Sequence, residues 1–175
     1  FAGYWEYLLD EAIFTAPPHP TWGGAGLIGH DGTLRGIGSL FVQQVISGGD
    51  LFNGNMVVPI DILKPIMDEL LTYGRTEQSA RPWLGMMTTE MDDALVVAGV
   101  TEGGPAQRAD VRVGDFVLGV GGQPVKELAE MFRRVWATGE AGVGIPLTLS
   151  RDGEMLDLTV QSVNRSDLLK SPQVH

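Results

Sequence analysis

The stretch Arg81-Pro82-Trp83-Leu84-Gly85-Met86 begins the part of the chain whose pattern decides the fold. After it, short apolar runs alternate with turn-forming pairs such as Gly104-Pro105 and Asp152-Gly153. Apolar runs of this length, punctuated by Gly, Pro and Asp, are typical of strands joined by tight turns. The sequence therefore predicts strands at residues 83–87, 95–100, 116–120, 143–149 and 155–160.

One segment of this part departs from the strand pattern. In residues 126–137 the apolar side chains recur every three or four positions, and Gly139 follows as a stop. This spacing predicts a helix with one buried face. The apolar residues of that face are Leu128, Met131, Phe132, Val135 and Trp136.

Four motifs in this part of the chain resemble, in order and spacing, the PDZ domain of bacterial HtrA/Deg-type serine proteases. The resemblance implies a small β-sandwich with two helices, which binds the C-terminal ends of extended peptides. Asp110 stands where this family commonly has Gly, and Asp tolerates a left-handed backbone better than most residues. The motifs are RPWLGM at 81–86, GGPA at 103–106 followed by Ala109, VGDFVL at 113–118 and GQPV at 122–125.

The loop of residues 83–86 is the predicted carboxylate site. Successive backbone N–H groups that converge form a small anion site, and a Gly within the loop allows backbone angles that other residues avoid. A peptide added to the strand after this loop gains main-chain hydrogen bonds, while its last side chain enters an apolar pocket. The predicted peptide-binding residues are Trp83, Leu84, Gly85, Met86, Leu128, Phe132 and Arg81.

Two alternatives remain open for these residues. The apolar ones are pocket residues or ordinary core residues, and for Leu128 and Phe132 the two interpretations weigh equally. Arg81 either attracts the peptide carboxylate or is a solvated surface charge.

The first part of the chain predicts a β-hairpin followed by a strand and a helix. Asp31-Gly32 lies between two apolar runs in residues 27–37, which is a strong hairpin signal. After a Gly-rich loop at residues 47–55, residues 56–59 suggest a strand and Asp61 suggests the N-cap of a helix. The apolar face of that helix is formed by Leu63, Ile66, Met67, Leu70 and Leu71.

Residues 14–37 resemble the nucleophile region of the same proteases, in which Gly-Asn-Ser-Gly-Gly-Pro-Leu leads into a hairpin. The aligned run here is TWGGAGL at 21–27. Gly23 takes the nucleophile position, and Thr21 takes a position whose backbone N–H contributes to the oxyanion hole in the family. A serine protease attacks with a hydroxyl whose proton a His removes, and Gly23 has no side chain.

The resemblance places the catalytic His and Asp of the family upstream of Phe1. We therefore expect no peptidase activity from this chain alone, either as a pseudoprotease or as part of a protease. A different register, with Ser39 as the nucleophile, is a weaker alternative. The three His residues have no paired carboxylates, so the sequence predicts no metal site and no cofactor; they are His19, His30 and His175.

The expected fold class is mainly β, with a partial trypsin-like β-barrel followed by a PDZ-like β-sandwich with two helices. The sequence predicts the C-terminal portion of a trypsin-like protease domain at residues 1–73, a linker at 74–80, the PDZ domain at 81–163 and a frayed or extended tail at 164–175.

Composition narrows the classes of partner. The 175 residues include 22 acidic and 12 basic side chains, which give a formal net charge of −10. Such a chain repels phosphate backbones, so nucleic acid is not an expected partner. The apolar runs are too short for membrane insertion, and the absence of Cys excludes thiol catalysis. The expected partners are the C-termini of peptides or unfolded proteins.

Two further expectations concern assembly and location. Apolar residues near the N-terminus either pack inside their own barrel or contact another chain in a homo-oligomer, because proteases of this family commonly assemble into trimers or larger cages. The resemblance also implies a periplasmic or extracytoplasmic location. The apolar residues concerned are Tyr4, Trp5, Tyr7, Leu8 and Leu9.

Overall fold

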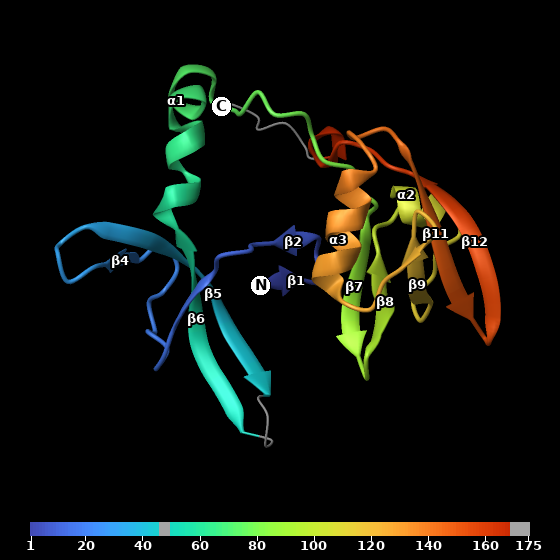
Figure 1. Ribbon diagram of the computed structural model, residues 1–175, viewed down its shortest axis with the longest axis horizontal. Helices are drawn as coiled ribbons and strands as arrows, with labels where there is room; N and C mark the ends of the chain where they lie inside the picture. The colour runs from blue at the N-terminus through green and yellow to red at the C-terminus, as the bar shows by residue number, and fades with distance from the viewer. Residues whose placement is uncertain (46–49, 169–175) are drawn as a thin grey trace. The chain divides into compact units, whose positions relative to one another are not determined.

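The computed structural model describes residues 1–45 and 50–168, and these residues form two compact units (Figure 1). The first unit contains Phe1 and residues 9–77, and the second contains residues 2–8 and 78 onward. The boundary between 77 and 78 lies within the segment predicted as a linker. His175 and the other residues after 168 lie outside the described residues, as do residues 46–49.

The first unit is built on an antiparallel sheet with the strand order β3-β6-β5-β4. The predicted turn at Asp31-Gly32 joins β4 to β5, and Gly32 there has φ +77°, which a Gly adopts without strain. The strands are β3 (Ile13–Thr15), β4 (Gly26–Ile28), β5 (Leu34–Val45) and β6 (Leu51–Pro59).

Two predictions for this unit are wrong. The Gly-rich loop ends before Leu51, because residues 51–55 already pair with β5 in the strand β6. Gly54 allows a close approach of strands rather than a turn: a Cβ there would lie 2.8 Å from the Thr15 carbonyl oxygen. Asp61 is not the N-cap of the helix, since it pairs with Lys64 in 3-10 turns that precede Met67. Pro65 lacks the N–H that a continuous α-helix would need.

Short helical elements follow β6. They are η1 (Ile60–Ile62), η2 (Lys64–Ile66) and α1 (Met67–Tyr73). Gly74 ends α1 in the left-handed conformation, and its N–H donates to the Leu70 carbonyl. Gly is the residue most often found at this left-handed C-cap position.

The second unit is a β-sheet with two helices. Its strand order is β12-β11-β9-β8-β7, with β10 paired to β9, so β7 is the edge strand beside α3. The mainly β fold class is thereby confirmed. The strands are β7 (Met86–Met91), β8 (Ala94–Val100), β9 (Phe116–Val120), β10 (Gln123–Pro124), β11 (Gly144–Arg151) and β12 (Glu154–Gln161), and the helices are α2 (Pro105–Arg108) and α3 (Leu128–Ala137).

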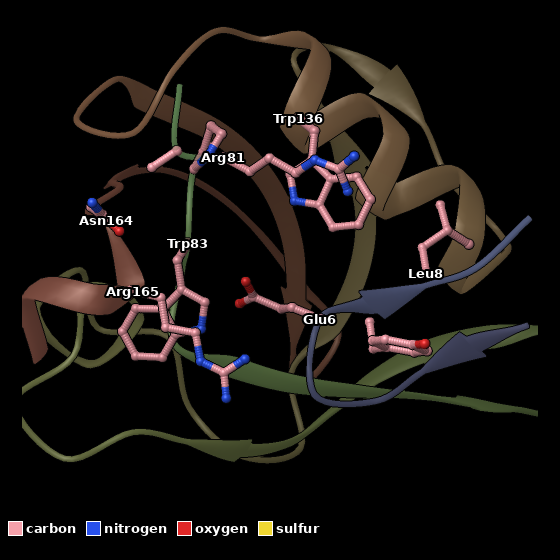
Figure 2. A pocket seen from close by; sticks show the side chains of 10 residues that line it. Glu6, Leu8, Arg81, Trp83, Trp136, Asn164 and Arg165 are labelled. Atoms are coloured by element: carbon pink, nitrogen blue, oxygen red, sulfur yellow. The ribbon is translucent and has the colours of Figure 1, made fainter. Parts of the chain in front are cut away.

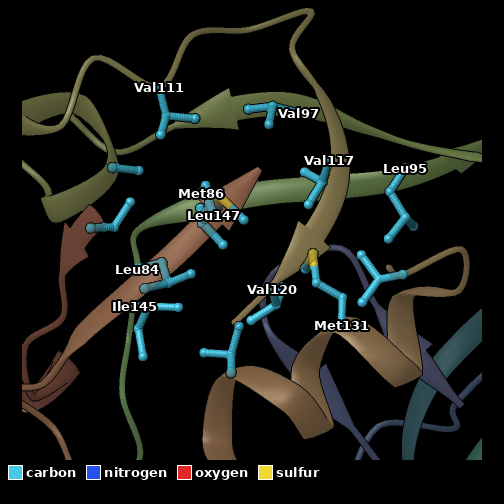
Figure 3. Packing of buried hydrophobic residues seen from close by; sticks show 14 of the residues in the cluster. Leu84, Met86, Leu95, Val97, Val111, Val117, Val120, Met131, Ile145 and Leu147 are labelled. Carbon is cyan, nitrogen blue, oxygen red and sulfur yellow. The ribbon is translucent and has the colours of Figure 1, made fainter. Parts of the chain in front are cut away.

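The core of the second unit lies between this sheet and α3 (Figure 3). The helix buries the face that the sequence predicted, and Phe132 stacks on the partly buried Trp136 with ring centroids 5.6 Å apart. Strands β7, β8, β9 and β11 supply the facing side chains, including Leu95, Val97 and Leu147. The strand β7 and the loop before it are therefore held from behind by a packed core.

A buried ion pair fixes the turn that precedes β9. Asp115 is 1% exposed, and its carboxylate accepts hydrogen bonds from the Arg151 guanidinium and from the Arg112 amide. The Arg151 hydrogen bonds hold the pKa of Asp115 below its usual range. Asp110 also binds Arg151, and its φ of +63° is the left-handed backbone that the sequence analysis allowed for.

The N-terminal residues do not pack where the sequence placed them. Residues 2–8 form a small hairpin of β1 (Ala2–Gly3) and β2 (Tyr7–Leu8) that belongs to the second unit. Leu8 packs against the core of that unit, so the prediction that these residues fill their own barrel is wrong for the hairpin. We call residues 2–8 the docked hairpin.

The segment after β12 is more ordered than expected. Residues Arg165–Leu168 form a 3-10 helix, η3, and the Asn164 side chain accepts a hydrogen bond from the Ser166 amide at its start. This side-chain cap satisfies a backbone donor that a frayed tail would leave to water.

Candidate functional site

In the loop of residues 83–86 the carbonyls of Leu84 and Gly85 are hydrogen-bonded to the rest of the domain. The Leu84 carbonyl accepts from the Ala106 amide at 2.8 Å, and the Gly85 carbonyl accepts from the Thr101 amide at 2.8 Å. Gly85 has φ +72°, and a Cβ at this position would lie 2.9 Å from the Trp83 ring. The loop therefore requires Gly at this position both for its backbone angles and for its packing.

A carboxylate of the chain itself occupies this loop. One oxygen of Glu6, Oε1, accepts hydrogen bonds from the Leu84 amide at 3.2 Å and from the Gly85 amide at 3.1 Å. Figure 2 shows the Glu6 side chain directed towards Trp83. Two successive amides thus converge on one oxygen, as in a small anion site, and their use by a peptide carboxylate stays a prediction.

The main chain of the docked hairpin also pairs with the edge strand. The Thr88 amide in β7 donates to the Tyr4 carbonyl at 3.1 Å. Tyr4 contacts Thr88, and Glu6, two residues later in the chain, contacts Gly85, three residues before Thr88. The turn of the hairpin thus contacts β7 through one main-chain hydrogen bond and the loop through a carboxylate.

The carboxyl group of Glu6 is in an unusual electrostatic environment. Burial raises its pKa to about 7. The amides of Leu84, Gly85 and Met86 act in the opposite direction, and so does the positive charge of Arg165. Because the burial effect is larger, a proton binds this carboxyl near neutral pH.

A cavity of about 380 Å³ lies beside Glu6 (Figure 2). Arg81 lines it, with its guanidinium 4.3 Å from the centre of the Trp136 ring in a cation–π contact. Arg165 lines it from η3. The cavity therefore carries two cations next to the carboxylate site, of which the sequence analysis named only Arg81.

The other predicted peptide-binding residues lie together in the second unit. Leu84, Met86, Leu128 and Phe132 are all buried, at 5% exposure or less, and belong to one apolar cluster. Ala2 and Leu8 of the docked hairpin pack against the same cluster. The four side chains thus belong to the packed core of the second unit.

The region aligned with a protease nucleophile forms a turn in the first unit. A side chain at Gly23 would meet no atom within 4 Å, and the φ of Gly24 is +77°. The Thr21 amide, by contrast, donates to Nδ1 of His19 at 3.2 Å. An amide engaged in this way is not presented to a substrate oxyanion.

A second cavity, of about 330 Å³, lies near this turn. Trp22, His19 and Asn55 are among the residues that line it. Asn55 is 2% exposed and its Oδ1 accepts from the His19 amide. The ring of His19 is engaged with Thr21 rather than with a nucleophile.

Two structural searches bear on other classes of function. Among residues 1–45 and 50–168, no cluster of three or more His, Cys, Asp or Glu side chains has the arrangement of a metal site. Within the same ranges, no helix is long and apolar enough to cross a membrane.

Comparison with known families decides the identity of the second unit. The family model for the PDZ domain matches residues 82–161. These residues are a PDZ domain. The loop of residues 83–86 thus lies at the start of the PDZ domain, and the docked hairpin lies on its edge strand.

Curated relatives extend the similarity beyond the PDZ domain. A probable periplasmic serine endoprotease, DegP-like, from Pseudomonas fluorescens is 28% identical over 86% of this chain and 33% of the relative. The periplasmic pH-dependent serine endoprotease DegQ of Escherichia coli is 26% identical over 78% of this chain and 31% of the relative. The chain, which resembles HtrA/DegP-type proteases over most of its length, spans about one third of the curated relatives it matches.

A solved structure shows the same fold. The HtrA-type protease AlgW with decapeptide matches with a TM-score of 0.53 and 23% identity, over 80% of this chain and 45% of that chain. At this identity the match supports the fold of the chain.

Sequence reasoning missed Glu6 and Arg165. Glu6 lies 79 positions before Gly85, in a segment assigned to the other domain, and Arg165 lies in the predicted tail. The signal available for Glu6 was its place in an aromatic run, Tyr4-Trp5-Glu6-Tyr7, where a lone acidic residue is out of pattern.

Proposed function

We propose that the PDZ domain binds the C-terminal ends of peptides or unfolded proteins at the loop of residues 83–86. The observation that carries this proposal is the convergence of the Leu84 and Gly85 amides on one carboxylate oxygen. A peptide C-terminus presents the same group. Hydrogen bonds from amides to an ionised acceptor are about twice as strong as neutral ones, which makes the loop selective for a free carboxylate.

The edge strand and the apolar cluster supply the rest of a peptide site. Strand β7 ends the sheet order, and its Thr88 amide already donates to an added segment. Leu84, Met86, Leu128 and Phe132 lie in the cluster against which that segment packs. This arrangement supports strand addition, in which main-chain bonds give affinity and the pocket gives side-chain preference.

We also propose that this chain does not hydrolyse peptide bonds. Gly23 at the position of the nucleophile has no hydroxyl, and the Thr21 amide is engaged with His19. Loss of the nucleophile alone costs a triad enzyme about a millionfold in turnover. The chain then acts through its PDZ domain, in a periplasmic or extracytoplasmic location like that named for its curated relatives.

The test is titration of the chain with ten-residue peptides made with a free C-terminus and as C-terminal amides. We use peptides that end in Leu, Val, Phe or Tyr, because the cluster beside the loop is apolar. The proposal predicts binding of free carboxylates and at least tenfold weaker binding of the amides. Equal affinity for both forms would remove the assignment.

A further inference from the structure

We propose that the docked hairpin is an internal competitor, which must leave the loop of residues 83–86 and the edge strand β7 before a peptide can bind there. We call this loop and strand the PDZ groove. This inference rests on the proposed function and adds its regulation. It concerns the contacts of residues 2–8 with the PDZ domain, which all lie within the second unit.

The docked hairpin makes two of the contacts that a peptide C-terminus would make. Its Glu6 carboxylate accepts hydrogen bonds from the amides of Leu84 and Gly85. Two residues earlier in the chain, the Tyr4 carbonyl accepts a hydrogen bond from the Thr88 amide of the edge strand. A second ligand cannot use the same two loop amides and the same strand edge at the same time, so the two occupants exclude each other.

The docked hairpin is shaped for this position by its own sequence. Residues Ala2 and Gly3 pair with Leu8 and Tyr7, which closes a short hairpin around Glu6. Glu6 has φ +64°, a left-handed backbone that turns the chain and presents the carboxylate. Trp5 packs edge-on against Tyr4 and stacks with Tyr7, with ring centroids 4.6 Å and 6.3 Å apart.

The docked hairpin is stabilised by few hydrogen bonds, so a peptide can displace it. Its strands are two residues long each, and two-residue strands contribute few ladder bonds. The apparent affinity for a peptide is the intrinsic affinity reduced by the fraction of molecules whose groove is open. A peptide with more main-chain bonds along β7 therefore competes successfully when its concentration is high enough.

Protonation of Glu6 sets the strength of the hold. Burial raises the pKa of Glu6 from 4.5 to about 7 in the docked state, so docking is accompanied by proton uptake between these values. The contribution of Glu6 protonation to the stability of the docked state is fully present below pH 4.5 and is lost as the pH rises through 7. The other charged or titratable side chains that line the cavity are Tyr7, Arg81 and Arg165. Docking is thus tightest in acid, and the groove opens towards alkaline pH.

The experiment is a fluorescence-polarisation titration of the full chain at pH 5.5 with the free-carboxylate peptides described above. Glu6→Ala removes the internal carboxylate, and Glu11→Ala removes an exposed one as the matched control. At pH 5.5 the docked Glu6 carboxyl is protonated, so we expect Glu6→Ala, which loses two neutral amide hydrogen bonds, to bind about tenfold more tightly than the wild type. Glu11→Ala should bind like the wild type.

A second variant keeps the test valid if Glu6→Ala disturbs the fold. Glu6→Gln retains a hydrogen-bond acceptor and cannot titrate. In the wild type we expect peptide affinity to rise about tenfold or more from pH 5 to pH 7.5. In Glu6→Gln this rise should be absent. At pH 8 the variant should bind peptides more weakly than the wild type, because its neutral side chain docks without first having to bind a proton, and the docked hairpin therefore competes better.

The outcomes separate the two proposals. If peptides bind with equal affinity to the wild type, Glu6→Ala and Glu11→Ala, and the wild-type affinity has the same pH profile as Glu6→Gln, internal competition is wrong and peptide binding stands. If no free-carboxylate peptide binds even to Glu6→Ala, the proposed function itself is wrong.

Discussion

Oε1 of Glu6 lies 3.1 Å from the amide nitrogen of Gly85, although 79 positions separate the two residues in the chain. The contact joins a carboxylate to a loop whose geometry suits carboxylates, and the same oxygen receives the Leu84 amide. It links the binding chemistry of the PDZ domain to a segment that lies far upstream in the sequence.

The first prediction concerns Gly85. Gly85→Ala forces a left-handed backbone on a residue with a Cβ and sets that Cβ 2.9 Å from the Trp83 ring. The left-handed backbone alone costs about 1–2 kcal/mol. We expect a larger loss of unfolding free energy in urea, together with loss of peptide binding.

Gly103→Ala is the matched control for this variant. Gly103 has φ +66°, but a Cβ there meets no atom within 4 Å. Gly103→Ala should lose only the unfolding free energy that the left-handed backbone costs, because its Cβ meets no ring, and it should still bind peptides. A Gly85→Ala protein that is as stable as Gly103→Ala and still binds peptides would show that the loop geometry is not required.

The second prediction concerns the position of the missing nucleophile. Gly23→Ser places a side chain in open space, so we expect the unfolding free energy to change by less than about 0.5 kcal/mol. Casein cleavage should remain absent, because the Thr21 amide, at an oxyanion-hole position, is engaged with His19. Cleavage by the wild-type chain would instead contradict the interpretation of Gly23.

Much of the PDZ domain was predictable because its signals are local. The helix α3 follows from apolar spacing within a dozen residues, and the left-handed Asp110 follows from the turn in which it lies. The convergent amides at Leu84 and Gly85 likewise belong to one short loop that contains a Gly.

The docked hairpin was not predictable for the opposite reason. An edge strand such as β7 accepts any segment with a suitable main chain, and the sequence does not say which distant segment reaches it. The N-terminus of α3 illustrates the same limit. Its first amide, on Leu128, donates to the Glu90 carboxylate 38 positions away at 2.6 Å.

The third prediction concerns the frame beneath the peptide site. Asp115→Asn leaves the Arg151 guanidinium without its buried partner, so we expect a loss of about 3 kcal/mol in unfolding free energy at pH 7. The pKa of Asp115 is lowered in the folded protein, so its contribution is present above the usual value of 3.8 and is lost as the pH falls further.

Urea unfolding at a series of pH values checks this third prediction. The difference between wild type and Asp115→Asn should shrink below pH 3.8. Glu154→Gln, at an exposed residue of β12, is the control and should unfold like the wild type at pH 7. A constant difference at all pH values would mean that Asp115 stabilises the turn through something other than its charge.

The most direct measurement of the central claim is a pH titration of the Gly85 amide by two-dimensional NMR of the full chain. The account predicts that its chemical shift follows a single proton with a midpoint near pH 7 in the wild type, and that the shift does not change over this range in Glu6→Gln. A Gly85 amide that is insensitive to pH in the wild type, or that titrates identically in both proteins, would contradict the account.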